Sequence, residues 1–232
     1  MVYEIAGLKV EMEPRFGRLT RQCQAYLSSG KPVMTVKPDP VDEVRAGMDR
    51  YPEEEREYIC CSAAFCRGII GQGRFFLHAS AVVYEGAAYL FSGPSGTGKS
   101  THTNLWHSLY DTPILNGDLN LLAFENRMPV VHGIPWCGTS GICTTETHPL
   151  GGIVILRQDR EDFVNTLSLD KQILSVTNRM ITPNWTHSLF EKNLQFASGL
   201  SACIPIVQLH CTPTRHAVEV MREYLKTTAP SL

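Results

Sequence analysis

One short stretch of the chain carries the residue types and the spacing of a phosphate-binding loop. Residues 91–106 read FSGPSGTGKSTHTNLW and meet the pattern G-x-x-x-x-G-K-[S/T] with Gly93, Gly98, Lys99 and Ser100. An apolar run precedes the loop and a helical run follows it, which is the context that the motif requires. The alternative is a glycine-rich turn that caps a helix and binds nothing. The fixed spacing and the flanking runs favour the phosphate loop.

The expected chemistry follows from the loop backbone and two side chains. Glycines let the loop turn its N–H groups toward a phosphate, and the helix beginning near Lys99 adds the positive end of its dipole. Lys99 would neutralise the β and γ oxygens, and the Ser100 hydroxyl would bind Mg²⁺. The sequence thus predicts ATP or a close relative as the ligand, with Mg²⁺. The predicted nucleotide-binding residues are Gly93, Pro94, Ser95, Gly96, Thr97, Gly98, Lys99, Ser100 and Thr101.

A carboxylate follows the loop at short range along the chain. Residues 114–115 indicate a buried strand that delivers Asp118 at its end. Strand, helix and strand fill the interval, so Asp118 can return to the sheet edge that carries the phosphate loop. Ligands of open α/β sheets tend to bind at such an edge, which makes Asp118 a candidate site residue.

Hairpins and helices are predicted around these residues. The β-favouring runs 80–84 and 87–91 are separated only by Glu85 and Gly86, a connection of hairpin type. The strand before the loop therefore has an antiparallel neighbour, unlike its counterpart in the parallel sheets of common phosphate-loop proteins. The other predicted strands span 2–12, 32–37, 151–158 and 204–211, with a second hairpin of 119–124 and 128–131; helices are predicted from 52 and over 99–109, 169–180, 185–200 and 212–225.

Residues 133–150, GIPWCGTSGICTTETHPL, form a long segment with little periodicity. Such a loop inside a compact domain predicts a lid or an acceptor-binding loop, with a surface connection as an equal alternative. Residues 1–70 are predicted to form an annex packed on a nucleotide-binding domain of residues 71–232, because no flexible linker separates the two.

Composition places the chain among ordinary globular proteins, with 232 residues, 43% of them hydrophobic and 19% charged. A net charge of -2 indicates no general nucleic-acid partner. No signal-peptide pattern or membrane-length apolar run is found, so the sequence predicts a cytoplasmic protein without a membrane partner. The eight cysteines lack zinc spacing and are expected to be reduced and mostly in the core, although Cys137 and Cys143 lie near the expected site.

Three segments, LHASAV, GPSGTGKST and LNGD, together resemble the catalytic domain of HPr kinase/phosphorylase. More distantly, they resemble the nucleotide domain of ATP-dependent phosphoenolpyruvate carboxykinase. The resemblance covers roughly residues 74–160. It implies the α/β fold of these two families, in which a phosphate loop is combined with a mixed, largely antiparallel sheet and flanking helices. It also implies that Lys99 and the loop amides form the triphosphate cradle.

The same resemblance implies roles for Asp118 and His78. Asp118 is similar to the first aspartate of the kinase family's Asp-Asp pair, which is the base on the acceptor serine, and it would share Mg²⁺ with Ser100. His78 matches a histidine that lies beside the active phosphate, with a hydrogen-bonded structural histidine as the alternative. Leu119 stands where the pair has its second aspartate. The catalytic arginine is unassigned: Arg157, at the end of a strand, is a candidate, but an ordinary surface residue is the favoured interpretation of it.

Motifs and resemblance together predict an ATP- and Mg²⁺-dependent kinase that transfers the γ-phosphoryl group to a hydroxyl, expected to be a serine of a small protein or peptide. One alternative is a nucleotide-binding regulator that has lost catalysis, as Leu119 and the missing charges near His132 and Trp136 suggest. Another is a kinase whose acceptor is the hydroxyl of a small molecule. The sequence leaves open whether the chain forms a homo-oligomer.

Overall fold

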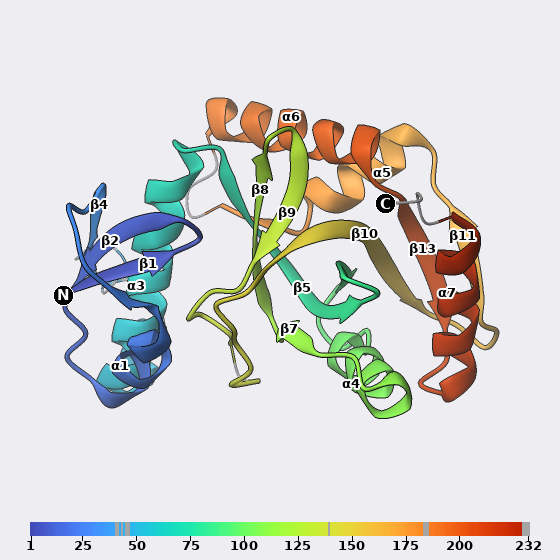
Figure 1. The fold of residues 1–232 in the computed structure, drawn as a ribbon, viewed down its shortest axis with the longest axis horizontal. Coiled ribbons are helices and arrows are strands. Elements are labelled where there is room, and N and C mark those ends of the chain that lie inside the picture. Colours follow the sequence, from blue (N-terminus) through green and yellow to red (C-terminus); the bar gives the residue numbers. More distant parts are fainter. Residues whose placement is uncertain (40–41, 43, 45–46, 139, 183–185, 229–232) are drawn as a thin grey trace.

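A computed structural model describes residues 1–39, 42, 44, 47–138, 140–182 and 186–228 of the chain. Within these ranges the chain forms a four-stranded sheet near the N-terminus and a nine-stranded sheet in the part that follows α3 (Glu53–Ile70). Helices lie on both faces of the larger sheet, and the smaller sheet stands beside it with its own helices (Figure 1).

The smaller sheet has the strand order β3-β1-β2-β4. Its first two strands are joined at Ala6 and Gly7, whose φ angles of 52° and 72° form a tight hairpin turn. The single strand predicted over 2–12 is therefore wrong, because the chain reverses there, whereas the strand predicted over 32–37 is confirmed. The elements of this region are β1 (Val2–Ile5), β2 (Leu8–Met12), α1 (Gly17–Cys23), β3 (Leu27–Ser28), β4 (Met34–Val36) and α3 (Glu53–Ile70).

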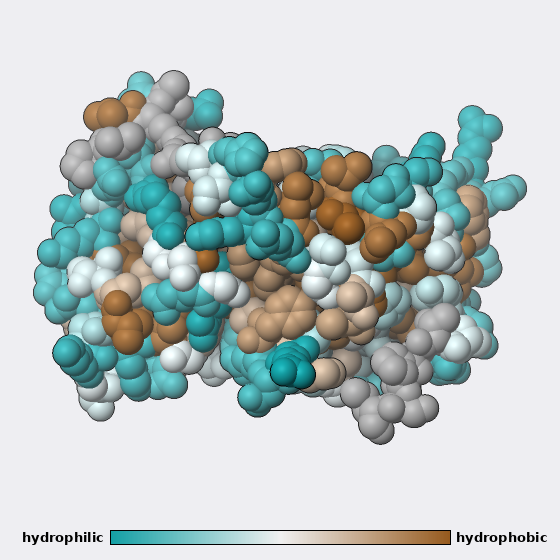
Figure 2. Space-filling view, turned by 90° about the horizontal axis from the view of Figure 1, so that it is seen from above, coloured by the Kyte–Doolittle hydropathy of each residue, from teal (hydrophilic) through white to brown (hydrophobic). Residues whose placement is uncertain are grey.

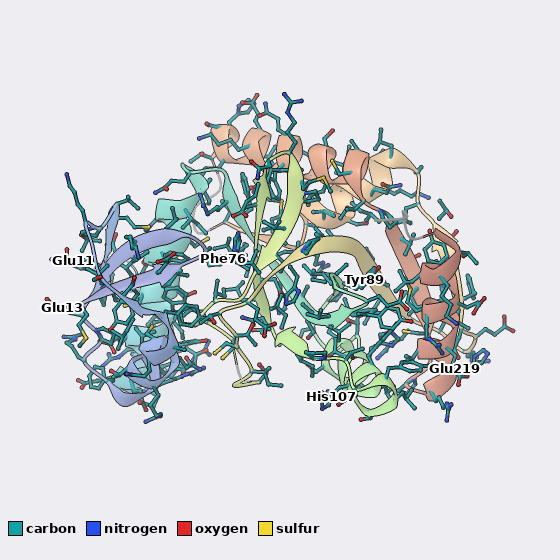
Figure 3. The ribbon with its side chains drawn as sticks, viewed as in Figure 1. Glu11, Glu13, Phe76, Tyr89, His107 and Glu219 are labelled. Carbon is teal, nitrogen blue, oxygen red and sulfur yellow. The ribbon has the colours of Figure 1, made fainter. Side chains whose placement is uncertain are left out.

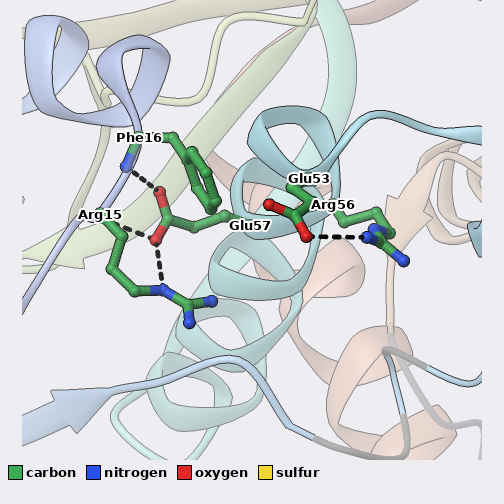
Figure 4. A pocket seen from close by; sticks show the side chains of 5 residues that line it. All are labelled: Arg15, Phe16, Glu53, Arg56 and Glu57. Carbon is green, nitrogen blue, oxygen red and sulfur yellow. Dashed lines mark hydrogen bonds and ion pairs between the residues drawn. The ribbon is translucent and has the colours of Figure 1, made fainter.

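The acidic start of α3 anchors the start of α1. The Glu57 carboxylate is buried and accepts hydrogen bonds from the backbone N–H groups of Arg15 and Phe16 at 2.8 and 3.0 Å (Figure 4). Glu54 accepts one from the backbone N–H of Arg18 at 2.5 Å. Because the first N–H groups of a helix lack partners within it, these carboxylates satisfy the start of α1 and fix it on α3.

The larger sheet has the strand order β11-β13-β10-β6-β5-β8-β9, with β7 and β12 beside β5. Most of its pairs are antiparallel, but β10 runs parallel to both β6 and β13. The start of β10 also pairs with β9, so five strands pair in a closed ring. The mixed, largely antiparallel α/β sheet is thus confirmed. The strands are β5 (Arg74–Tyr84), β6 (Ala87–Ser92), β7 (Ile114–Asn116), β8 (Leu119–Glu125), β9 (Met128–His132), β10 (Thr147–Gln158), β11 (Phe163–Thr166), β12 (Met180–Ile181) and β13 (Ile206–Cys211).

Both predicted hairpins of this sheet are confirmed. β5 and β6 connect through Glu85 and Gly86, with φ angles of 49° and 82°. β8 and β9 connect through Asn126 and Arg127, with φ angles of 50° and 69°. Positive φ at both central residues gives the turn type that matches the twist of paired strands. β5 is longer than the predicted run 80–84 because its first half pairs with β8 instead of β6.

Two hydrophobic clusters lie on opposite faces of the larger sheet, because successive strand residues point to opposite faces. Leu90 of β6 packs in the first cluster with α3, α5 and α6, and Phe91 packs in the second with α4 and α7. Phe76 belongs to the first cluster and Tyr89 to the second; both are labelled in Figure 3. The first cluster includes apolar side chains of the smaller sheet, so residues 1–70 share a core with the rest. The helices are α4 (Lys99–Tyr110), α5 (Leu169–Thr177), α6 (His187–Cys203) and α7 (Arg215–Thr228).

Helices α3 to α7 lie where the sequence predicts them, with shifted ends, whereas α1 has no counterpart among the predicted helices. α5 ends at Thr177, not at 180, because Met180 joins β12 and pairs with Leu77 of β5. α6 begins after Trp185, which lies outside the described residues, as do residues 229–232 of the predicted domain. The proposed division of the chain at residue 70 stays a prediction.

Exposed apolar side chains gather on the face formed by α5, α6 and the tips of β8 and β9 (Figure 2). They include Phe124, Met128, Leu169, Leu174 and Phe190. Among the residues that the structure describes, no helix combines the length and the apolar character that crossing a membrane would need.

Candidate functional site

The phosphate loop, residues 93–98, links β6 to α4, whose first turn contributes the predicted site residues 99–101. Gly96 and Gly98 have φ angles of 80° and 93°, a left-handed backbone that residues with a side chain rarely adopt. Gly98 is the N-cap residue of α4, and no side chain of the described residues caps the first turn. The first N–H groups of α4 are therefore available to an anion, in line with the predicted phosphate binding.

Lys99 lies at the start of α4, folded back over its own loop. Its Nζ donates to the carbonyl oxygens of Gly93 and Pro94 at 3.1 and 3.2 Å. Burial lowers the pKa of Lys99; the negative charge of Asp118 opposes this shift, and the positive charge of Arg179 adds to it. The charges of Asp118 and Arg179 thus both act on Lys99 beside the loop.

The structure brings His78 and Asp118 together. His78 lies in β5 and Asp118 at the junction of β7 and β8, both of which run antiparallel to β5. His78 Nε2 and Asp118 Oδ1 are 2.7 Å apart, and both side chains are partly exposed. Asp118 Oδ2 faces Gly138, since a Cβ atom on Gly138 would lie 2.2 Å from that oxygen. One carboxylate oxygen is therefore held by the imidazole, and the other lies under the backbone of the segment 133–150.

Buried hydroxyl and amide groups fix the backbone on both sides of this pair. Ser92 donates to the carbonyl of His78, and Ser80 donates to the carbonyl of Gly117, each at 2.7 Å. Asn120 donates to the carbonyl of the residue after His78 at 2.5 Å. All three donors are fully buried, so their hydrogen bonds replace those that water would make. Sequence reasoning missed them, although polar residues inside apolar strand runs were the available signal.

A pocket of about 220 Å³ lies between Asp118 and the first turns of α4. Ser100 lines it together with Asp118, so the hydroxyl and the carboxylate border the same space. Mg²⁺ prefers oxygen ligands and usually takes one or two from the protein, with water and phosphate oxygens completing its shell. This donor set fits the predicted Mg²⁺ ligands. Among the described residues, no group of three or more His, Cys, Asp or Glu side chains forms a metal site without phosphate.

A larger pocket of about 370 Å³ lies across α4 from the first one. Thr101 and Leu105 line it, whereas Ser100 and Asn104 line the first pocket, so the start of α4 separates the two. Gln158, at the end of β10, donates to the carbonyl of Gly96 at 3.0 Å and holds the loop between the pockets.

His102 forms part of this second pocket as a buried, neutral ring. Its Nε2 accepts a hydrogen bond from Trp106 Nε1 at 3.1 Å, and burial lowers its pKa to about 4 from the usual 6.5. The unfolded chain takes up this proton near pH 6.5, but the folded chain does so only near pH 4. Stability present above pH 6.5 is therefore lost as the pH falls toward 4.

We expect His102 to lower the free energy of unfolding by about 2 kcal/mol between pH 7 and pH 5. Urea unfolding of wild type and His102→Gln at both pH values measures this contribution, because glutamine keeps a hydrogen-bond acceptor but does not titrate. The decrease should be smaller in the variant by about 2 kcal/mol. An equal decrease in the two proteins would contradict the assignment.

Arg157, the candidate for a catalytic arginine, lines a pocket beside β11 and β13 that does not include Asp118. The arginine beside the site is Arg179, which follows α5. Its backbone carbonyl accepts the N–H of His78 at 2.9 Å, and its charge acts on Lys99. Arg179 is half-buried and has no carboxylate partner among the described residues. The sequence spacing does not indicate Arg179, because this residue lies in the short connection between α5 and the two-residue strand β12.

The segment 133–150 divides into three parts. Its last four residues belong to β10, and its start is buried, with Trp136 stacked on Phe65 of α3 at a ring distance of 4.8 Å. The middle carries Ser140 and Ile142, which line the pocket beside Asp118, whereas residue 139 lies outside the described residues. The segment is therefore not a plain surface connection, since it forms one wall of the candidate site.

Leu119, His132 and Trp136 serve the core. Leu119 is buried in the first hydrophobic cluster, so a carboxylate at this position would face apolar side chains. His132 is buried, and its Nδ1 lies 2.8 Å from the Thr147 hydroxyl. All three side chains are thus buried in the protein interior.

No disulfide joins cysteines of the described residues. Cys137 and Cys143 lie together, and the hydrogen bond between their thiols, followed by burial, raises the pKa of Cys137. Gln22 also donates to Cys137 Sγ at 3.1 Å. These contacts fit the expected structural thiol.

No protein-family profile matches this sequence, and no curated protein matches it. Among solved structures, the chain is similar to the HPr(Ser) kinase/phosphatase from Coxiella burnetii. The two share 12% identical residues at a TM-score of 0.41, over 66% of this chain and 97% of that chain.

Proposed function

We propose that this protein is an ATP- and Mg²⁺-dependent kinase that transfers the γ-phosphoryl group to a hydroxyl. One observation carries the proposal: Ser100 and Asp118 line a single pocket at the uncapped start of α4, and the charge of Asp118 acts on Lys99 beside it. An anion-binding helix start beside a cation, a hard oxygen ligand and a carboxylate is the set of groups that phosphoryl transfer requires.

In this proposal the two pockets divide the donor from the acceptor. The nucleoside of ATP occupies the pocket lined by Thr101, Leu105 and Pro213, and the phosphates follow the loop toward Lys99. The γ-phosphoryl group then lies toward the pocket of Asp118. The larger volume on the donor side, about 370 Å³ against about 220 Å³, agrees with this division.

The transfer step uses Asp118 as the proton acceptor. The acceptor oxygen forms a bond to the γ-phosphorus as the bond to the β,γ-bridging oxygen breaks, and the hydroxyl proton passes to Asp118 while ADP leaves. His78 holds Asp118 Oδ1 and orients the carboxylate. Lys99 and Arg179 counter the charge on the transferring group. Mg²⁺ bound by Ser100 and Asp118 would neutralise phosphate charge.

The acceptor pocket is small and is lined by polar residues, including Ser100, Asn104 and Ser140. Its volume fits one hydroxyl-bearing side chain, and we propose a serine of a small protein or peptide. A small-molecule hydroxyl is the alternative acceptor. The buried Leu119 favours a second candidate, a nucleotide-binding regulator without transfer.

The test is transfer of label from γ-labelled ATP in the presence of Mg²⁺, with a peptide fraction and a metabolite fraction of a cell extract offered separately. Label in either fraction supports the kinase and identifies the acceptor class, provided that chelation of Mg²⁺ with EDTA prevents it. ATP binding without transfer to either fraction, and without ATP hydrolysis, supports the regulator. Absence of ATP binding would remove both candidates.

Arg179 should matter for rate more than for nucleotide binding. If its guanidinium stabilises charge on the transferring phosphoryl group, Arg179→Met lowers the turnover of ATP by about 100-fold. The affinity for ATP, measured by calorimetry, should change by less than about tenfold. Arg157→Met is the matched control, because that arginine lies beside β11 and β13. Equal turnover in the two variants would exclude Arg179 from the reaction.

A further inference from the structure

Gly138 covers the carboxylate that the proposed reaction uses. Its φ angle is 61°, and a Cβ atom there would lie 2.2 Å from Asp118 Oδ2. Only the backbone of a glycine fits this close to the carboxylate. The position of Gly138 therefore limits where the Asp118 side chain can turn once Oδ1 is hydrogen-bonded to His78.

Two residues of the N-terminal region hold Gly138 through both of its backbone polar groups. Its N–H donates to the hydroxyl oxygen of Tyr58 at 3.0 Å, and its carbonyl accepts from Arg18 Nη2 at 2.7 Å. Tyr58 is on α3 and Arg18 is on α1. Arg18 precedes Gly138 by more than a hundred residues in the sequence. We call Arg18 and Tyr58 the Gly138 clamp.

The Gly138 clamp is itself tightly held. The Arg18 guanidinium lies over the Tyr58 ring at 3.7 Å from the ring centre, and it forms an ion pair with Glu55. The backbone N–H of Arg18 is bound by Glu54 at 2.5 Å. Tyr58 is buried. Stacking, an ion pair and burial leave these two side chains little freedom, so the hydrogen bonds that they offer to Gly138 are preorganised.

We propose that Arg18 and Tyr58 are positioning residues for Asp118, which they hold indirectly by fixing Gly138 against its carboxylate. The inference rests on the proposed phosphoryl transfer for its effect on rate, but its structural part concerns the His78–Asp118 pair alone. Residues 1–70 thus contribute to the reaction without touching either substrate. Holding a general base in place is worth a large factor in rate, since a misplacement of about 1 Å can cost roughly 100-fold.

A matched control comes from a second contact between the same two parts of the chain. The buried hydroxyl of Tyr26 donates to the carbonyl of Thr144, in the same segment as Gly138. Among the described residues, the hydroxyl donor to Thr144 is Tyr26, whereas the hydroxyl that accepts from Gly138 is that of Tyr58. Tyr26→Phe and Tyr58→Phe therefore each remove one hydroxyl between the N-terminal region and this segment. Only Tyr58→Phe removes a hydrogen bond to Gly138.

The experiment measures NMR signals of the His78 ring and the kinetics of Mg²⁺-dependent ATP turnover in Tyr58→Phe, Arg18→Met and Tyr26→Phe. In the two clamp variants we expect shifted His78 ring signals and a fall in kcat of roughly 10- to 100-fold, with the KM for ATP within about threefold of wild type. Arg18→Lys, which keeps a cation and a donor, should restore part of kcat. Tyr26→Phe should match wild type in both measurements.

Gly138→Ala tests the same contact from the other side, because its Cβ atom would displace Asp118. It should shift the His78 signals as Tyr58→Phe does. If the His78 signals in both clamp variants and in Gly138→Ala match those of Tyr26→Phe, the positioning role is overturned. If wild type turns over no ATP while the His78 signals shift as expected, the contact stands and the proposed function fails.

Discussion

Asp118→Asn is expected to lower phosphoryl transfer by a factor of about 10² to 10⁴ while ATP remains bound. Asparagine keeps the shape of the side chain and can still meet His78, but it cannot take the proton of the acceptor hydroxyl. The carboxylate borders the pocket opposite the nucleoside side of α4, so its loss leaves most nucleotide contacts in place. Transfer and ATP affinity must therefore respond differently.

The measurement compares single-turnover transfer from γ-labelled ATP with the affinity for ATP from calorimetry. Asp111→Asn is the control, since it removes the same charge at the far end of α4, where φ is 52° and asparagine is well tolerated. Transfer by Asp118→Asn at the rate of this control would exclude Asp118 as the base. A parallel loss of ATP affinity by more than about tenfold would instead assign it to the Mg²⁺-nucleotide complex.

Lys99→Ala is expected to reduce both ATP affinity and turnover, the first by at least about tenfold and the second by about 10² to 10³. Lys99 Nζ rests on the carbonyl oxygens of Gly93 and Pro94, which a phosphate would replace as partners. Burial already lowers the pKa of Lys99, so an anion that meets the ammonium group gains from its incomplete hydration. This favourable electrostatic interaction stabilises bound ATP, and it stabilises the transition state further.

Calorimetry with ATP and with ADP, combined with initial rates, separates the two parts of this effect. Lys192→Ala on α6 removes an exposed lysine and controls for the change in net charge. We expect the loss of affinity to be larger for ATP than for ADP, because Lys99 is assigned to the β and γ oxygens. Wild-type affinity for both nucleotides in Lys99→Ala would mean that the glycine-rich turn caps α4 and does not bind phosphate.

The elements that lie close together in sequence were predictable. The hairpins β5–β6 and β8–β9, the helix after the phosphate loop and the short strand before Asp118 all carry local signals, and the structure has each of them. The hydrogen bond between His78 and Asp118 was not predicted, because it depends on the register of β5 against β8. The packing of whole strands against each other decides that register, and the periodicity of one strand does not report it.

The errors have physical causes that can be named. Ala6 adopts a positive φ, so a run that alternates like one strand folds as two. Arg157 ends a strand, but it lines a pocket beside β11 and β13 and not the pocket of Asp118, in line with its interpretation as a surface residue. Arg179 reaches the site through long-range pairing of β12 with β5, and the Gly138 clamp joins residues far apart in the chain. Such contacts leave no trace in local spacing.

The parallel pairing of β10 with β6 has a consequence for how the site is assembled. β6 pairs with β5 across a two-residue turn, and hairpins of this kind form in about 1–10 μs. The other neighbour of β6 is β10, in which Leu150 pairs with Ala88 of β6. Helix α4 and three further strands lie between β6 and β10 in the sequence. Closing so long a connection is slow, because the chain gives up conformational entropy before the new strand pair can form. On the ribosome, the phosphate loop therefore acquires its first supporting strand early and its second only after β10 has been synthesised.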